Sequence, residues 1–418
     1  MKLHIKNGRI VDPASGKDGT GELLIADGVI AKEIGKADRV IDAKGLVVAP
    51  GFIDLAARLR EPGFEYRATL ESEIEAALAG GVTSLACPPD TDPPLDEPGL
   101  VDMLCRRALA LSRARVYPVG ALTMKLAGER LTEMAELAEA GCVAFSQANS
   151  PLADTQVLWR ALQYAATFGF PVWLRAEDAW LGRGGVAHEG EVATRLGLPG
   201  IPAFAETIAL ATLLELARAT RARLHVCRLS SAGGVELVRA AKREGLPVTC
   251  DVAVHHLHLS ERDIGYFDSN CRLEPPLRSE RDRDALALGL EDGTIDCACS
   301  DHTPVDDDGK HLPFAEAEPG ATGLELLLPL TLKWGESRKL GIAKTLARIT
   351  SDPARVLGVP SGLAPGAPAD IAIFDPAATL RVSAEALKSQ GKHTPFAGYE
   401  LQGRVRYTLV GGHLVYEA

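Results

Sequence analysis

GFIDLAARL, residues 51–59, is a short apolar run with the length and composition of a buried β-strand. Longer helical segments separate most of the similar runs that follow it. These further strand candidates are GVTSLACPP (81–89), ARVYPVGAL (114–122), GCVAFSQA (141–148), PVWLRAE (171–177), ARLHVCRLSS (222–231), PVTCDVAVHH (247–256) and TIDCACSDH (294–302). Strands that alternate with helices in this way predict an α/β fold of the (β/α)8, TIM-like barrel type.

The segments between the strand candidates support this prediction. TLESEIEAALAG (69–80) and LTEMAELAEAG (131–141) both end at glycine, as helices commonly do. A doubly wound open sheet is the second candidate fold, but no G-x-G-x-x-G run follows an early strand. The barrel is therefore the expected architecture.

Both ends of the chain have a different pattern, typical of β-hairpins. LHIKNGRIVD (3–12) carries an Asn-Gly pair, ELLIADGVIAKEI (22–34) an Asp-Gly pair, and GRVRYTLVGGHLVYEA (403–418) a Gly-Gly pair. Short hairpins bury too little surface to be stable alone. We therefore expect residues 1–50 and 362–418 to form one small β-sandwich domain beside a barrel of residues 51–361.

Composition narrows the class of protein. The chain has 418 residues, 46% of them hydrophobic, and a formal net charge of -11. An acidic chain is a poor match for nucleic acid or an anionic membrane. The N-terminal sequence lacks the pattern of a signal peptide, and no apolar run has the length of a membrane span. The eight cysteines are scattered without a C-x-x-C pair, which predicts reduced thiols in a cytoplasmic protein.

In a barrel of this type, functional side chains gather at the carboxyl ends of the strands. The residues at or near those ends are Ala56, Arg58, Asp90, Gln147, Arg175, Arg228, His255, His256 and Asp301. This set is rich in arginine and contains few side chains that bind metals.

The motifs around these positions resemble those of the dihydroorotases, members of the amidohydrolase superfamily. GFIDLAARLREPG (51–63) is similar to the family signature GFIDLHVHLREPG. The likeness continues in the same order through CPPDTDPP (87–94), AFSQANSP (144–151), LRAED (174–178), LGLPGIPAFAE (196–206), HVCRLSSAGG (225–234), HHLHL (255–259), PPLR (275–278), CSDHTP (299–304), GLELLLPL (323–330), PADIAIFDP (368–376) and TPFAGYELQGRV (394–405). It spans essentially the whole chain and implies a barrel of the amidohydrolase type.

The resemblance also implies a set of zinc ligands: an H-x-H pair on the first strand, a carboxylate or modified lysine on the fourth, one histidine on each of the fifth and sixth, and an aspartate on the eighth. At those positions this chain has Ala56, Ala57 and Arg58; Gln147, Ala148 and Asn149; Arg175; Arg228; and Asp301. A guanidinium group stays protonated and offers no lone pair to a metal. We therefore expect no zinc, no other cofactor and no dihydroorotase activity, with Asp301 as a vestige.

Positions that the resemblance assigns to the substrate are also changed. Arg60 is retained, but Asp90 and Glu274 stand where the family has asparagine, and Val305 stands where it has histidine. A carboxylate at Asp90 would repel an anionic substrate.

Buried charges require partners. We therefore expect Arg58, Arg175 and Arg228 to pair with Asp301, and also with Asp54 and Glu177; the alternative is that these arginines turn toward solvent.

Histidines are expected to be structural. His255, His256 and His258 could form a metal site, but the family keeps its HH pair outside the ligand set. In a strand, His256 and His258 would share one face. His225 and His302 are expected to make hydrogen bonds.

Among dihydroorotase relatives, this sequence resembles the bacterial pseudo-dihydroorotases. That likeness implies a non-catalytic subunit that supports aspartate transcarbamoylase in de novo pyrimidine biosynthesis. Its expected partner is the transcarbamoylase catalytic subunit, with self-association inside a hetero-oligomer. Two alternatives remain open: an active amidohydrolase with an atypical or absent metal site, and a sensor that binds an anionic pyrimidine precursor through its arginines.

Overall fold

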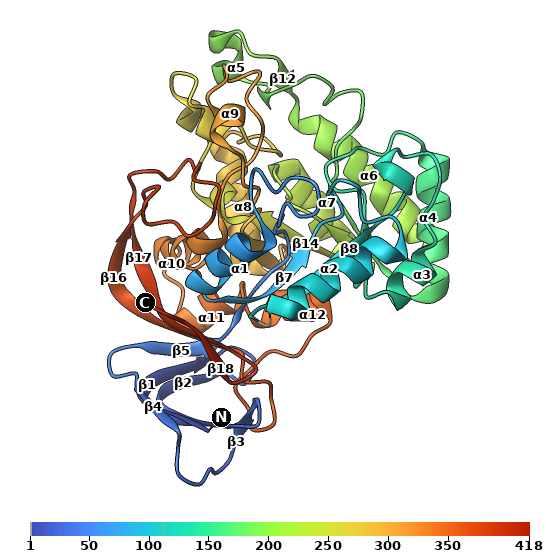
Figure 1. Cartoon of the computed structure of the whole chain (residues 1–418). Helices are drawn as coiled ribbons and strands as arrows, with labels where there is room; N and C mark the ends of the chain where they lie inside the picture. Colours follow the sequence, from blue (N-terminus) through green and yellow to red (C-terminus); the bar gives the residue numbers. More distant parts are fainter. Residues whose placement is uncertain (1, 112) are drawn as a thin grey trace.

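The structure is a computed structural model that describes residues 2–111 and 113–418. Helices surround a parallel sheet, and a second sheet lies beside this assembly (Figure 1). In the described residues the parallel sheet has eight strands in the order β15-β14-β13-β10-β9-β8-β7-β6. Their bounds are β6 Phe52–Asp54, β7 Val82–Cys87, β8 Arg115–Ala121, β9 Ala144–Ser146, β10 Pro171–Leu174, β13 Arg223–Val226, β14 Val248–Ala253 and β15 Cys297–Cys299.

The first and last strands of this sheet meet just beyond their carboxyl ends. Ala57 and His302 form an isolated parallel bridge, and the backbone N–H of Arg58 donates to the carbonyl of His302 at 2.9 Å. This contact closes the sheet into a barrel. Each strand lies within the run from which it was predicted, but it ends earlier, because the residues beyond it form the mouth of the barrel. The barrel prediction is therefore confirmed.

Helices cover the outside of the barrel (Figure 1). Their bounds are α1 Leu70–Ala79, α2 Pro98–Leu111, α3 Met134–Glu139, α4 Thr155–Phe168, α5 Glu191–Leu196, α6 Ala203–Thr220, α7 Ala232–Arg243, α8 Glu280–Asp292, α9 Asp307–Lys310, α10 Leu327–Ser337, α11 Ile342–Ala347 and α12 Ser351–Leu357. The expected helix over 69–80 is α1. Thr69 caps its first turn and Gly80 its end, as the sequence indicates.

The two ends of the chain pair into one sheet, as expected; it is called the small sheet here because it belongs to the smaller part of the chain, although it too has eight strands in the described residues. Its strands follow the order β18-β17-β16-β5-β1-β2-β3, and β4 also pairs with β1. Their bounds are β1 Leu3–Asp12, β2 Lys17–Ala26, β3 Val29–Ala31, β4 Arg39–Asp42, β5 Val47–Pro50, β16 Ile371–Arg381, β17 Glu400–Val410 and β18 His413–Glu417. The strands form one connected hydrogen-bonded sheet, which differs from the two separate sheets of the expected sandwich.

Two of the three expected turns are present. Asp27 and Gly28 join β2 to β3, and Gly411 and Gly412 join β17 to β18, all with positive φ. The turn expected at Asn7 is wrong, because β1 continues through it with a register shift between Ile5 and Gly8. The left-handed Asn7 forms a bulge there and not a hairpin turn.

The segment between β16 and β17 leaves the small sheet and packs on the barrel. Ser389 donates to the buried carboxylate of Glu73 at 2.7 Å, and the backbone N–H of Lys388 donates to Glu325 at 2.8 Å. Part of the segment assigned to the small domain is therefore fastened to the barrel, while the domain boundaries themselves stay a prediction.

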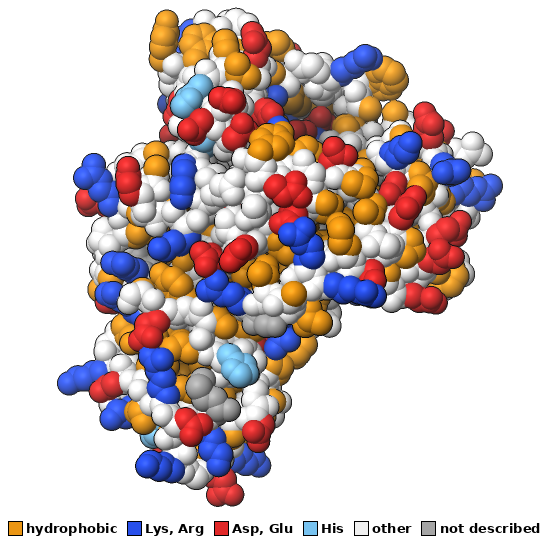
Figure 2. Space-filling view, in the orientation of Figure 1, with side chains coloured by type: hydrophobic (Ala, Val, Ile, Leu, Met, Phe, Trp, Pro, Cys, Tyr) orange, Lys and Arg blue, Asp and Glu red, His pale blue; other side chains and the backbone are white. Residues whose placement is uncertain are grey.

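The eight cysteines are free, and most are buried, as predicted for reduced core thiols. Within residues 2–111 and 113–418, no helix has both the length and the apolarity needed to cross a membrane. On the face drawn in Figure 2, acidic and basic side chains are interspersed.

Candidate functional site

The carboxyl ends of the barrel strands carry unusual backbone conformations. Arg60, Ala148, Arg228 and Asp301 all have positive φ, between 49° and 61°. Residues other than glycine rarely adopt a positive φ, because this backbone conformation costs free energy. Strained residues of this kind cluster at functional sites in proteins. These four positions are all among those that the sequence singled out.

Asp301 lies at the centre of the arginines. Its Oδ1 accepts hydrogen bonds from Arg228 Nη1 at 3.0 Å and from Arg58 Nη1 at 3.4 Å. The three residues are 4–5% exposed. The expected pairing of Arg58 and Arg228 with Asp301 is therefore confirmed, and the alternative, that these side chains turn toward solvent, is wrong.

Asn149, which the sequence placed with Gln147 and Ala148 at the fourth-strand position, is also a member of this cluster, a contact that was not predicted. Its side-chain oxygen accepts from Arg228 Nη2 at 2.7 Å and from Arg58 Nη2 at 3.1 Å. It thus joins the same two guanidinium groups that share Asp301. The resemblance had marked its position, but no pattern in the sequence indicated that its side chain would join two arginines.

All three nitrogens of the Arg58 guanidinium group donate hydrogen bonds. In addition to Asp301 and Asn149, it donates from Nε to Asp90 at 2.7 Å and from Nη1 to Thr303 at 3.0 Å. Burial raises the pKa of Asp90, but the combined attraction of Arg58, Arg60 and Arg228 outweighs burial, and the net effect is a lowered pKa. Asp90 is therefore the ion-pair partner of Arg58.

Arg175 forms a second group of ion pairs. Its guanidinium contacts the carboxylate of Glu177 and that of Glu274, the latter at 2.7 Å, and it donates to the Asn149 carbonyl at 3.1 Å. The expected pairing with Glu177 is confirmed. Glu274, like Asp90, is an acid that neutralises an arginine of this cluster.

Asp54 does not join the arginines, so this part of the expectation is wrong. Its carboxylate accepts from the backbone N–H of Ser300 at 2.9 Å and also from the Ser300 hydroxyl. Burial raises the pKa of Asp54 despite these hydrogen bonds. The residue lies on β6, below the mouth, where it fastens the last strand to the first.

The remaining predicted positions hold no exposed reactive group. Arg60 donates from Nε to the carbonyl of Pro304 at 3.0 Å, and burial, followed by repulsion from Arg58, lowers its pKa to about 10. Gln147 exchanges hydrogen bonds with Thr123. The other predicted positions, Ala56, Ala148 and Val305, are buried apolar side chains.

His256, His258 and His302 are hydrogen-bonded within the fold, as expected of structural residues, whereas the buried Nε2 of His255 has no partner among the described residues. His302 contacts Glu73 at 2.6 Å, and His258 contacts the Leu330 carbonyl at 2.9 Å. His255 and His256 lie in a short 3-10 helix over Val254–Leu257, so the predicted strand geometry is wrong there. Burial lowers the pKa of both to about 3, so they are neutral at pH 7.

A metal ion requires several lone-pair donors around one point. In the part of the chain that the structure describes, one group of His, Cys, Asp and Glu side chains meets this requirement: His225, Cys227 and Asp251. Asp301 is not in it. At the centre of the cluster, the carboxylate of Asp301 and the amide oxygen of Asn149 both already accept hydrogen bonds from guanidinium groups.

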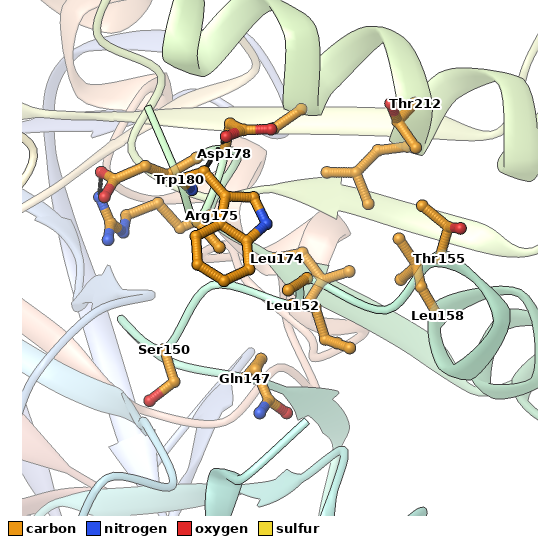
Figure 3. Close-up of a pocket in the computed structure, with 15 residues that line it drawn as sticks. Gln147, Ser150, Leu152, Thr155, Leu158, Leu174, Arg175, Asp178, Trp180 and Thr212 are labelled. Atoms are coloured by element: carbon orange, nitrogen blue, oxygen red, sulfur yellow. Dashed lines mark hydrogen bonds and ion pairs between the residues drawn. The ribbon is translucent and has the colours of Figure 1, made fainter. Parts of the chain in front are cut away.

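A cavity of about 90 Å³ opens beside the arginine cluster. Arg175 and Gln147 line it next to apolar side chains, and the ring of Trp180 lies between Arg175 and Leu152 (Figure 3). Typical ligand pockets have volumes of about 300–1,000 Å³, so this cavity is small. The cavity therefore has room for a side chain or a few waters.

Comparison with known proteins gives consistent matches over the whole chain. Residues 45–233 match the family described as Dihydro-orotase-like, and residues 199–416 match the Amidohydrolase family. A "Dihydroorotase-like protein" of Pseudomonas aeruginosa is 45% identical, with 100% of both chains covered. A "Dihydroorotase" of Geobacter sp. (strain M21) is 40% identical, also with 100% of both chains covered.

Solved structures with similar folds include an L-hydantoinase (dihydropyrimidinase) from Arthrobacter aurescens. It has a TM-score of 0.87 and 26% sequence identity, and the match covers 99% of this chain and 96% of that one. A D-hydantoinase structure has a TM-score of 0.82 at 22% identity and shares the fold.

Proposed function

Because this chain belongs to the dihydroorotase-like family of amidohydrolases, we propose that it is a non-catalytic member of that family. In this proposal it is a subunit that supports the assembly and activity of aspartate transcarbamoylase in de novo pyrimidine biosynthesis. The observation that carries the proposal is the buried ion-pair cluster, in which Arg58 and Arg228 share the carboxylate of Asp301.

The residues at the mouth do not fit the zinc that the family implies. Zinc binds histidine, thiolate and carboxylate ligands, and here Arg58, Arg175 and Arg228 stand at three of the ligand positions implied by resemblance. The remaining ligand, Asp301, already accepts from two guanidinium groups. A divalent cation would have to displace these cations and then lie among them, which is electrostatically unfavourable.

The acidic replacements support the same conclusion. Asp90 and Glu274, which the resemblance places in the substrate site, are the partners of Arg58 and Arg175. The cluster contains three guanidinium groups and four carboxylates, so it offers no excess positive charge to an anionic substrate. This disfavours the sensor alternative as well, because the arginines are already neutralised by internal acids.

The partner in this proposal comes from the resemblance to bacterial pseudo-dihydroorotases. The complete barrel and the complete small sheet are retained, although the chemistry of the mouth has changed. A fold kept without its reaction fits a role in assembly, where surface shape matters and the interior needs only to be stable. The transcarbamoylase catalytic subunit would then perform the reaction, and this chain would hold the complex together.

A working amidohydrolase with an atypical or absent metal site is the second candidate. Its support is the relatives named "Dihydroorotase", of which the Geobacter protein is 40% identical over the whole chain. The two candidates differ in one measurable property, the turnover of carbamoyl aspartate or dihydroorotate by the isolated chain.

The test co-expresses this chain with the transcarbamoylase catalytic subunit. We expect co-elution on size exclusion and a higher transcarbamoylase activity than the catalytic subunit has alone. In parallel, the isolated chain is assayed for dihydroorotase turnover with added zinc, with the Geobacter protein as the reference. Turnover well above background would overturn the non-catalytic proposal. Separate elution together with unchanged transcarbamoylase activity would overturn the proposed partner.

A further inference from the structure

A second group of polar side chains lies inside the barrel. His225 is on β13, Cys227 directly follows that strand, and residues two apart in an extended segment point the same way. On the neighbouring strand β14, His225 is paired with Thr249, which places Asp251 two residues farther, beside Cys227. Candidate ligand atoms of the three side chains all lie within 4.8 Å of one another.

We propose that His225, Cys227 and Asp251 bind one zinc ion, at a site distinct from the one implied by the family. Imidazole nitrogen, thiolate sulfur and carboxylate oxygen are the ligand types that zinc takes in proteins. His225 Nε2 and Asp251 Oδ2 are 3.0 Å apart. Two ligands at about 2.0 Å from a tetrahedral zinc are separated by about 3.3 Å, so the pair needs to open only slightly.

Neighbouring groups already hold the ligands in position. Thr249 Oγ1 is 2.8 Å from His225 Nδ1 and so fixes the imidazole by its other nitrogen. The backbone N–H of Arg228 donates to Asp251 Oδ1 at 2.5 Å, while Oδ2 is turned toward His225. Contacts of this kind orient the ligands in metal sites.

The charges also balance. Zinc binding replaces the thiol proton of Cys227, which is released to solvent, so the site holds a thiolate, a carboxylate and a neutral imidazole around a divalent cation. The bound centre is then electrically neutral, as a buried site requires. The nearby Arg228 side chain is already paired with Asp301 and does not oppose the ion.

One ligand of this site, His225, borders a cavity at the end of the barrel opposite the mouth. A cavity of about 210 Å³ is lined by His225 and Thr249. It is also lined by Pro171, Arg223 and Val248, which lie at the amino ends of their strands. Cys227 and Asp251 do not line this cavity, so an ion and a water as its fourth ligand would have to pass His225 to reach the site.

The test uses the full chain, stripped of metal with a chelator and then titrated with Co²⁺ as a spectroscopic probe and with Zn²⁺ by calorimetry. We expect one ion per chain and a cobalt–thiolate charge-transfer band. Cys227→Ser should remove the band and weaken zinc binding by at least about tenfold. The matched control is Cys250→Ser, since Cys250 is a buried cysteine that lies next to Asp251 but outside the cluster.

The wild-type titration decides the proposal even if a variant folds poorly. Absence of a cobalt–thiolate band in the wild-type chain would overturn it, and so would equal zinc binding by folded Cys227→Ser. Asp301→Asn separates this site from the mouth. Zinc that persists in folded Cys227→Ser and is lost in Asp301→Asn lies at the mouth, and that result would contradict both this inference and the proposed function. Zinc binding without dihydroorotase turnover supports both.

Discussion

The substitution Asp301→Asn replaces the shared carboxylate by an amide. It tests whether Asp301 has a structural role or a catalytic one. The substitution keeps the size of the side chain and removes its charge. Arg58 keeps Asp90 at 2.7 Å and Thr303 at 3.0 Å. Arg228 keeps only the Asn149 oxygen at 2.7 Å and a long contact of 3.5 Å to the Glu274 carbonyl. The unpaired charge therefore falls mainly on Arg228.

Removing one partner of a buried ion pair costs about 3–5 kcal/mol. Because Arg58 remains compensated, we expect the lower end of this range, about 3 kcal/mol. The measurement is the free energy of urea unfolding, followed by circular dichroism. Asp18→Asn is the control. It breaks an ion pair with Arg9 on the surface and should cost less than about 1 kcal/mol.

A double-mutant cycle makes the test specific for the pair. Arg228→Met should be less destabilising by about 2 kcal/mol in the Asp301→Asn background than in the wild-type chain, because the two residues act on each other directly. If Asp301→Asn lowers the free energy of unfolding no more than Asp18→Asn does, or if the cycle shows no coupling, the ion pair between Arg228 and Asp301 does not stabilise the fold.

Three other outcomes are expected. Ala56→His combined with Arg58→His should give no dihydroorotase turnover, because arginines still stand at two other positions that resemblance assigns to ligands; measurable turnover would show that the site is misplaced. Arg175→Met should cost about 3–5 kcal/mol in urea unfolding, since it leaves two carboxylates unpaired, and Glu274→Gln should cost less, because Arg175 keeps its other partner; the reverse order would contradict the assignment. Burial lowers the pKa of Lys310 from 10.5 to about 7. Between these two pH values the unfolded chain binds more protons than the folded chain, so the free energy of unfolding should rise from pH 7 to pH 9. Lys310→Met should flatten this rise, measured as the midpoint of urea unfolding.

The residues that differ from the family pattern at the mouth of the barrel form ion pairs with one another. Taken singly, Asp90 and Glu274 look like damage to a substrate site, and Arg58 and Arg175 like damage to a metal site. In the structure each acid contacts one of the arginines. A guanidinium group buried at this point would be costly without its carboxylate. The acidic positions are therefore explained by ion pairing within the chain.

Some features could be predicted from the sequence because they depend on local pattern. The alternation of apolar runs and helical segments gave the barrel, and each strand lies inside its predicted run. The Asp27–Gly28 and Gly411–Gly412 turns were also predictable, since positive φ is a local preference of these residues. Resemblance identified the positions around the mouth, including Arg58, Arg175 and Arg228.

Other features depend on contacts between distant segments. The turn expected at Asn7 became a bulge because β1 pairs with three other strands at once. The Asn149 bridge between Arg58 and Arg228, and the grouping of His225 with Cys227 and Asp251, arise when neighbouring strands come into register. The sequence by itself determined the elements and the side chains available at their ends. Only the tertiary structure decided which charges meet, because barrel closure brings residues far apart in the chain within hydrogen-bond distance.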